Sequence, residues 1–155
     1  MRDTSDTDNI ADELQKQIMA EVKQQYSPKV IDSWQHPQNW GIMHNADGYA
    51  KLTGPCGDTM EISIIVQHST IKKCTFDTDG CGASIACGSI ITEMATGMSL
   101  QQAKRIGDKQ VLEYCGGLPE ENQHCAILAA NTLQAAIRSY EHIEHAPWKR
   151  HYRKT

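Results

Sequence analysis

Three cysteines stand apart from the apolar patterns of this sequence and could do chemistry. Cys56 lies in a turn of composition Gly-Pro-Cys-Gly-Asp (residues 54–58), Cys81 lies between two glycines, and Cys125 follows His124. Thiolates and imidazoles are soft ligands that suit zinc or iron-sulfur chemistry, whereas calcium and magnesium prefer oxygen. The cysteines are far apart in sequence and form no CxxC pair, so their spacing leaves a metal site and scattered structural thiols equally open.

Cys81 is a candidate reactive thiol because a strand is predicted to end, and a helix to begin, at this residue. Backbone N–H groups and the helix dipole at such a position favour the thiolate, which is the form that binds metal or attacks sulfur. A Cys-His nucleophilic enzyme is a rival interpretation. Adjacent residues on a helix point about 100° apart, so we expect that His124 does not act as the base for Cys125.

Two further groups could complete a metal site. Asp58 is a candidate hard and labile fourth ligand, with a turn-forming bond to its own backbone as the alternative. His124 is either a ligand or a residue that orients one. The candidate metal ligands are therefore Cys56, Asp58, Cys81, His124 and Cys125.

The other cysteines are predicted to have different surroundings. Cys74 alternates with Phe76 in a predicted strand, and Cys87 lies on an apolar helical stripe, so both are expected in the core. Cys115 precedes Gly116 and Gly117 and could either reach the site or face solvent. The histidines expected to be solvated surface residues are His44, His68, His142, His145 and His151.

An α+β fold is predicted from the elements that must position these residues. Alternating apolar residues predict strands over 49–53, 60–66 and 71–78, joined by short connections into a three-stranded antiparallel meander. Helical periodicity follows, first over 83–94 and ending at Gly97, then in short pieces over 99–106 and 109–114. Pro119 is expected to open the long last helix. Since a small sheet alone is marginal in water, helices should pack on one of its faces.

The sequence also predicts an additional helix over 10–25, because Ile10, Leu14, Ile18 and Val22 recur at a spacing of four. The expected organisation is a disordered tail (1–9), this extra N-terminal helix (10–25), a main domain (26–144) and a basic tail (145–155) that contains Trp148.

Bulk properties exclude several classes of protein. The chain has 155 residues and a formal net charge of -4 with interspersed signs, so one domain is expected and nucleic acid is not an expected partner. No stretch reaches the ~18 apolar residues of a membrane span, and the polar start lacks an export signal. A cytoplasmic location is therefore expected, where the six cysteines stay reduced.

Five segments, in this order, resemble one known family. They are Tyr26-Ser27-Pro28-Lys29-Val30-Ile31-Asp32, His36-Pro37-Gln38-Asn39, Gly54-Pro55-Cys56-Gly57-Asp58-Thr59-Met60, Asp79-Gly80-Cys81-Gly82-Ala83-Ser84-Ile85-Ala86 and Gln123-His124-Cys125-Ala126-Ile127-Leu128-Ala129. From Tyr26 to about Ile143 the chain resembles the IscU or NifU N-terminal type of iron-sulfur cluster assembly scaffold.

The resemblance implies a scaffold rather than an enzyme, with an α+β fold whose motif cysteines meet at one exposed end. It implies that Cys56, Cys81 and Cys125 are ligands of a [2Fe-2S] cluster, with Asp58 or His124 completing or tuning the site and with zinc held in the apo form. The implied partners are a cysteine desulfurase, an electron donor such as a ferredoxin and acceptor apoproteins, and a homodimer is left open. The alternative function is a zinc-bound sulfur acceptor for the desulfurase.

The chain departs from this family pattern in two places. Where the IscU branch has a Leu-Pro-Pro-Val-Lys segment for a dedicated chaperone, this chain has Leu-Pro-Glu-Glu-Asn at residues 118–122. The resemblance therefore does not extend to the chaperone segment. The helix expected over 10–25 precedes the usual start of the domain, and it is either a partner-binding or oligomer element or a plain surface helix.

Overall fold

A three-stranded antiparallel sheet forms one layer of the domain, in the order β1 (Gly48–Thr53), β2 (Thr59–Gln67), β3 (Thr70–Thr78). The computed structural model describes residues 4–144. Met60, Ile62 and Ile64 alternate along β2 with no exposed surface, because successive strand residues point to opposite faces of a sheet. The predicted meander is confirmed.

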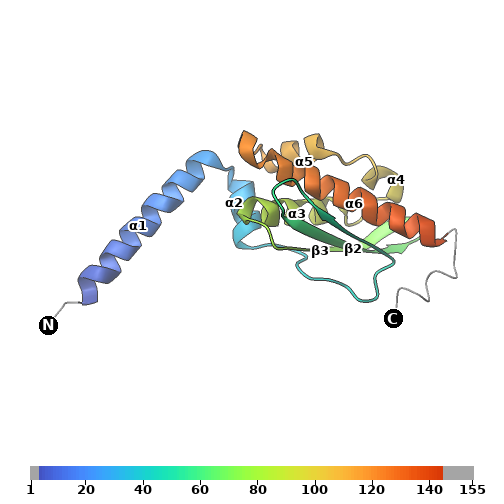
Figure 1. The fold of residues 1–155 in the computed structure, drawn as a ribbon, viewed down its shortest axis with the longest axis horizontal. Coiled ribbons are helices and arrows are strands. Elements are labelled where there is room, and N and C mark those ends of the chain that lie inside the picture. The colour runs from blue at the N-terminus through green and yellow to red at the C-terminus, as the bar shows by residue number, and fades with distance from the viewer. Residues whose placement is uncertain (1–3, 145–155) are drawn as a thin grey trace.

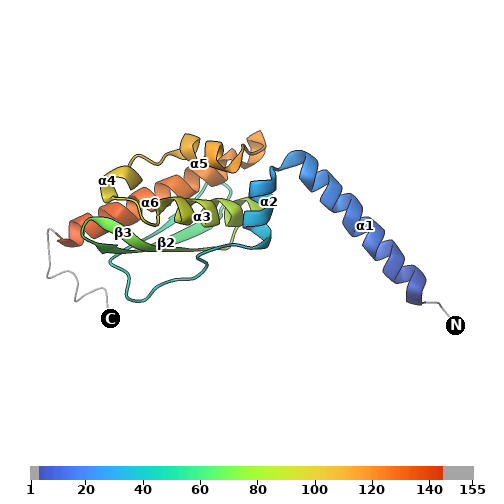
Figure 2. The ribbon, with the colours of Figure 1, turned by 180° about the vertical axis from the view of Figure 1, so that it is seen from behind.

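The helices lie together on one side of this sheet (Figure 1; Figure 2). They are α2 (Pro28–Gln35), α3 (Gly82–Ala95), α4 (Leu100–Ala103), α5 (Asp108–Cys115), the short 3-10 helix η1 (Glu120–Asn122) and α6 (Gln123–Glu144). α6 packs along β1 and β2, while α3 packs on β3. Phe76, Ile90 and Leu133 are fully buried between these layers. The α+β fold class is thereby confirmed.

The start of the last helix differs from the prediction. Pro119 has an extended ψ of 146° and precedes the 3-10 turn η1, and α6 begins at Gln123. Proline was expected at the first position of the long helix itself. The shift makes Cys125 the third residue of α6, so its side chain emerges within the first turn.

The additional helix is longer than predicted. α1 spans Thr4–Gln25, so the tail expected over residues 1–9 is wrong for residues 4–9. This stretch contains Asp6 and Asp8, and carboxylates favour the positive end of a helix dipole. Figures 1 and 2 show that α1 contacts the domain at α2 and otherwise projects away from it. Residues 145–155, expected to form a basic tail, lie outside the described part of the chain.

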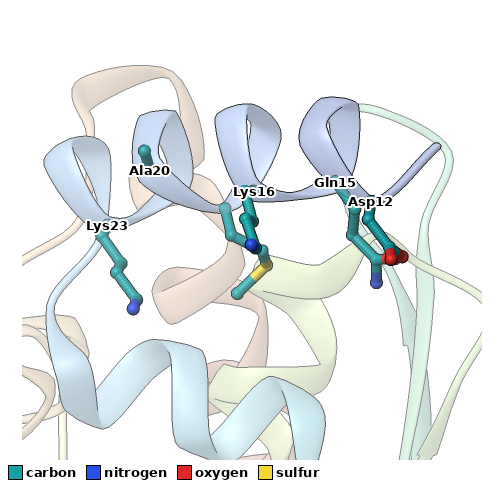
Figure 3. Close-up of a pocket in the computed structure, with 6 residues that line it drawn as sticks. Asp12, Gln15, Lys16, Ala20 and Lys23 are labelled. Carbon is teal, nitrogen blue, oxygen red and sulfur yellow. The ribbon is translucent and has the colours of Figure 1, made fainter. Parts of the chain in front are cut away.

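Both faces of α1 are largely exposed, and within it only Met19 and Val22 are half-buried among the residues whose burial is described. Side chains of Asp12, Gln15, Lys16 and Lys23 point to one side and line a pocket (Figure 3). Met19 lies on that side too, with its sulfur 4.0 Å from the Gln35 amide of α2. Of the apolar stripe, Ile10, Leu14 and Ile18 have exposed fractions of 58%, 53% and 58%, and Val22 is half-buried. Within residues 4–144 no helix is long and apolar enough to cross a membrane.

Candidate functional site

The turn between β1 and β2 carries Cys56 and Asp58. Its backbone is closed by hydrogen bonds from the Gly54 N–H to the Asp58 carbonyl at 2.7 Å and from the Gly57 N–H to the Gly54 carbonyl at 3.0 Å. Gly57 has a φ of +83°, which a side chain would strain. Because the backbone closes the turn, the Asp58 carboxylate is available for other contacts, and it accepts a hydrogen bond from Ser84 at 3.2 Å.

Cys81 is the N-terminal capping residue of α3, as the sequence predicted. The glycine after it is required by a close approach, since a Cβ on Gly82 would come within 2.5 Å of the Trp34 ring on α2. A Cβ on Gly80, before it, would come within 2.6 Å of the Ser84 hydroxyl. The two glycines therefore seat Cys81 between α2 and the turn that carries Asp58.

Ser84 links three of the candidate residues, although the sequence did not predict a role for it. Its side chain is fully buried. Its Oγ lies 3.2 Å from Asp58 Oδ2, 3.4 Å from Cys125 Sγ and 3.8 Å from Cys81 Sγ. The signal that could have found it is its position three residues after Cys81, because residues at that spacing share one face of a helix.

His124 also reaches the site. One ligand atom from each of Asp58, His124 and Cys125 lies within 4.8 Å of the others. The expectation that His124 and Cys125 point apart is wrong, because His124 Nε2 lies 3.6 Å from Cys125 Sγ. Both residues lie in the first turn of α6.

The two thiols that contact Ser84, those of Cys81 and Cys125, have pKa values shifted in opposite directions. Burial raises the pKa of Cys125 to about 11, and the nearby Cys81 and Asp58 add to this against the Ser84 hydroxyl, which lowers it. Partial burial is also the largest effect on Cys81 and raises its pKa. The combined hydrogen-bonding influence of Ser84 and Ala83 outweighs that burial and leaves the pKa of Cys81 below its ordinary value.

These values confirm that Cys81 favours the thiolate more than an ordinary cysteine does. They also weigh against the Cys-His enzyme, because a buried Cys125 with a high pKa stays a thiol at neutral pH.

The remaining cysteines are placed as follows. Cys56 is exposed on the turn, and in the described part of the chain its sulfur has no recorded contact with the other candidate ligands. Cys74 and Cys87 are buried, as predicted. The alternative that Cys115 faces solvent is wrong, because it is fully buried in α5 and its thiol donates to the Leu112 carbonyl at 3.2 Å.

The predicted surface histidines His44, His68 and His142 are exposed, while His145 and His151 lie outside the described residues. The segment that departs from the family pattern has a structural contact of its own. Asn122 donates from its side-chain amide to the Tyr26 hydroxyl at 2.7 Å. This bond ties the approach to α6 to the first residues of the domain.

Of the motif cysteines, Cys81 and Cys125 meet at Ser84. Cys56 and Cys81 are exposed, whereas Cys125 is fully buried. The donor set at this end contains thiols, an imidazole and a carboxylate. Such a set fits a tetrahedral zinc ion or the iron of an iron-sulfur cluster. Fold and site together define a small α+β domain that presents soft metal ligands at one end.

Comparison with known proteins assigns the family. The profile of the family described as NifU-like N terminal domain matches residues 25–147, and the chain belongs to this family. It is 44% identical over 116 residues to the iron-sulfur cluster assembly scaffold protein IscU 1 of Archaeoglobus fulgidus, covering 74% of this chain and 76% of that protein. It is 38% identical over 122 residues to the IscU scaffold protein of Azotobacter vinelandii, covering 76% and 94%.

A solved structure supports the fold alone. The N-terminal NifU-like protein from Brucella abortus has a TM-score of 0.61 at 16% identity, over 78% of this chain and 97% of that one. The family match and the similarity to the IscU scaffold proteins confirm the family resemblance seen in the sequence.

Proposed function

We propose that this protein is a scaffold on which an iron-sulfur cluster is assembled and from which it is transferred to acceptor apoproteins. The observation that carries this proposal is the contact of one buried hydroxyl, Ser84, with Asp58, Cys81 and Cys125, which come from three separate segments. If the cysteines were structural residues scattered through the fold, two of them would not contact the same side chain. The similarity to proteins named as IscU scaffolds supports the same function.

The proposed ligands of a [2Fe-2S] cluster are Cys56, Cys81 and Cys125, with Asp58 or His124 at the fourth position. The proximity of Asp58 and His124 to Cys125 supports this set. Four thiolates would favour retention of the cluster, whereas a carboxylate or imidazole leaves one corner that exchanges more readily. Exchange at that corner suits a protein that must release its cargo. Zinc is the proposed occupant when no cluster is present, because it accepts the same donors.

Cys81 is the proposed entry point for sulfur, because it is exposed and its pKa is lowered. Its thiolate attacks the outer sulfur of a persulfide on a cysteine desulfurase. The donor's sulfur–sulfur bond breaks, the desulfurase cysteine leaves as a thiolate, and Cys81 becomes the persulfide. Each transferred sulfur then takes up two electrons to become sulfide, supplied by ferrous iron and by an electron donor such as a ferredoxin.

Anaerobic reconstitution with iron, cysteine and a cysteine desulfurase tests this function. Absorption spectra and iron and sulfide analysis are expected to show a cluster on the wild type that transfers to an apoprotein. The variants Cys56→Ala, Cys81→Ala and Cys125→Ala should each fail. Cys74→Ala is the matched control, since it removes a buried thiol from β3 that the site does not use. A wild type that binds only zinc, yet accelerates the desulfurase, would replace the scaffold with the zinc-bound sulfur acceptor.

A further inference from the structure

Ser84 is a buried polar side chain that contacts three of the candidate ligands, Asp58, Cys81 and Cys125. A serine hydroxyl has one proton to donate and two lone pairs to accept with. It can therefore donate to only one of Asp58, Cys81 and Cys125 at a time. The ionised carboxylate is the stronger acceptor, and the structure has this proton directed to Asp58 Oδ2 at 3.2 Å.

The surroundings of this hydrogen bond show why a positioning group is needed. Asp58 lies at the end of a turn that contains Gly54 and Gly57, and its side chain is only half-buried. Without a partner, its carboxylate could rotate toward solvent. Ser84, in contrast, is fully buried in the first turn of α3 and makes its contacts from a rigid helix.

Gly80 provides the second observation. A Cβ at this position would come within 2.6 Å of Ser84 Oγ and within 3.0 Å of Asp58 Oδ2. The hydroxyl and the carboxylate thus meet in a space that exists because residue 80 has no side chain. The pair is therefore built into the junction between β3 and α3.

We propose that Ser84 is a positioning residue that holds the Asp58 carboxylate beside Cys125, so that this carboxylate forms the non-thiolate corner of the metal site. This inference rests on the proposed function for its metal site and names which of the two candidate fourth ligands is held in place. His124 contacts the site as well, but its recorded partner is the Cys125 sulfur. Ser84 itself is not a ligand.

Cobalt binding to the purified chain tests the inference without cluster assembly. Loss of a residue that orients a metal ligand typically lowers metal affinity 10- to 100-fold. Ser84→Ala should therefore bind cobalt roughly 10-fold more weakly than the wild type, while the thiolate-to-cobalt absorption bands persist. Ser84→Thr keeps the hydroxyl and should restore much of the affinity.

A double-mutant cycle identifies the route of action. If Ser84 acts through Asp58, the Ser84→Ala change should have no further effect on cobalt affinity in an Asp58→Ala background. Ser89→Ala is the matched control, because Ser89 is a fully buried serine on the same helix whose hydroxyl accepts from the Gln38 N–H at 2.9 Å. It should lower stability and leave cobalt affinity and the spectrum unchanged.

The possible outcomes distinguish the positioning role of Ser84 from the proposed scaffold function. Equal affinity of Ser84→Ala and wild type, or additive effects of Ser84→Ala and Asp58→Ala, would overturn the positioning role. A wild type that shows no thiolate-to-cobalt bands would overturn the metal site and the inference together. A wild type that binds cobalt as expected but yields no transferable cluster would overturn the scaffold function alone.

Discussion

The exposed rim of the site and its buried floor differ in what they can contribute. The rim consists of Cys56 and Cys81, both exposed, and the floor consists of Ser84 and Cys125, both fully buried. Rim thiols can meet a sulfur donor or an acceptor protein, whereas floor groups cannot be reached without local opening. A scaffold needs both properties, since cargo must be held firmly enough to assemble and still be accessible for transfer.

The largest expected difference between rim and floor is in thiol reactivity. The pKa of Cys81 lies below its ordinary value, whereas burial raises that of Cys125 to about 11. A lowered pKa keeps the thiolate present at lower pH, whereas Cys125 ionises only as the pH approaches 11. At pH 8 the thiolate fraction of Cys81 should therefore exceed that of Cys125 by roughly 100-fold or more.

Iodoacetamide labelling of the metal-free protein between pH 6 and 10, followed by mass spectrometry of the labelled peptides, measures this difference. Burial of Cys125 slows its reaction further in the same direction. Cys74 is an internal control, because burial raises its pKa to about 12. Simultaneous labelling of Cys81 and Cys125 across this range would show that the distinction between rim and floor does not hold in solution.

For metal affinity, the buried floor is expected to matter more than the exposed rim. Cys125 is held by packing before any metal arrives, whereas Cys56 must be fixed from an exposed turn at a cost of about 1–2 kcal/mol for each backbone residue ordered. Cys125→Ala should therefore lose roughly 10-fold more zinc affinity than Cys56→Ala. Competition with a colorimetric chelator measures both values. Equal losses would mean that the turn is as preorganised as the helix ends.

A smaller effect, on the free energy of unfolding, is expected when the glycine that follows Cys81 is replaced. Gly82→Ala would place a methyl group against the Trp34 ring, and such overpacking typically costs 1–3 kcal/mol. Gly57→Ala is the matched control in the exposed turn, where nothing lies within 4 Å and only the φ of +83° is strained, at about 1–2 kcal/mol. Urea unfolding measures both. A Gly82→Ala protein as stable as the wild type would show that Trp34 moves aside without cost.

The difference between rim and floor also explains how much of the site the sequence could predict. Cys56 and Cys81 were found because glycine-rich surroundings mark exposed boundaries, and the strands followed from simple alternation. Ser84 was missed, since its role depends on contacts with Asp58 and Cys125, which are distant in sequence. Cys115 was left undecided for a related reason: two following glycines indicate the end of a helix but not which way its last side chain points.

The extra helix shows the same limit of pattern analysis. Residues at a spacing of four predicted an apolar face on α1, and periodicity identifies such a face without saying what covers it. In the structure Ile10, Leu14 and Ile18 of this face are exposed, and only Val22, near the domain, is half-buried. Periodicity was therefore a sound guide to the presence of the helix and no guide to its packing.

The smallest expected effect follows from that exposure. Because Leu14 and Ile18 are more than half exposed, Leu14→Ser with Ile18→Ser should change the free energy of unfolding by no more than about 0.5 kcal/mol for each substitution. Leu133→Ala in α6 is the contrast, since removing a fully buried leucine typically costs about 2–5 kcal/mol. Urea unfolding at several protein concentrations measures both. A large loss from the α1 substitutions, dependent on concentration, would mean that the apolar face is covered by another molecule in solution.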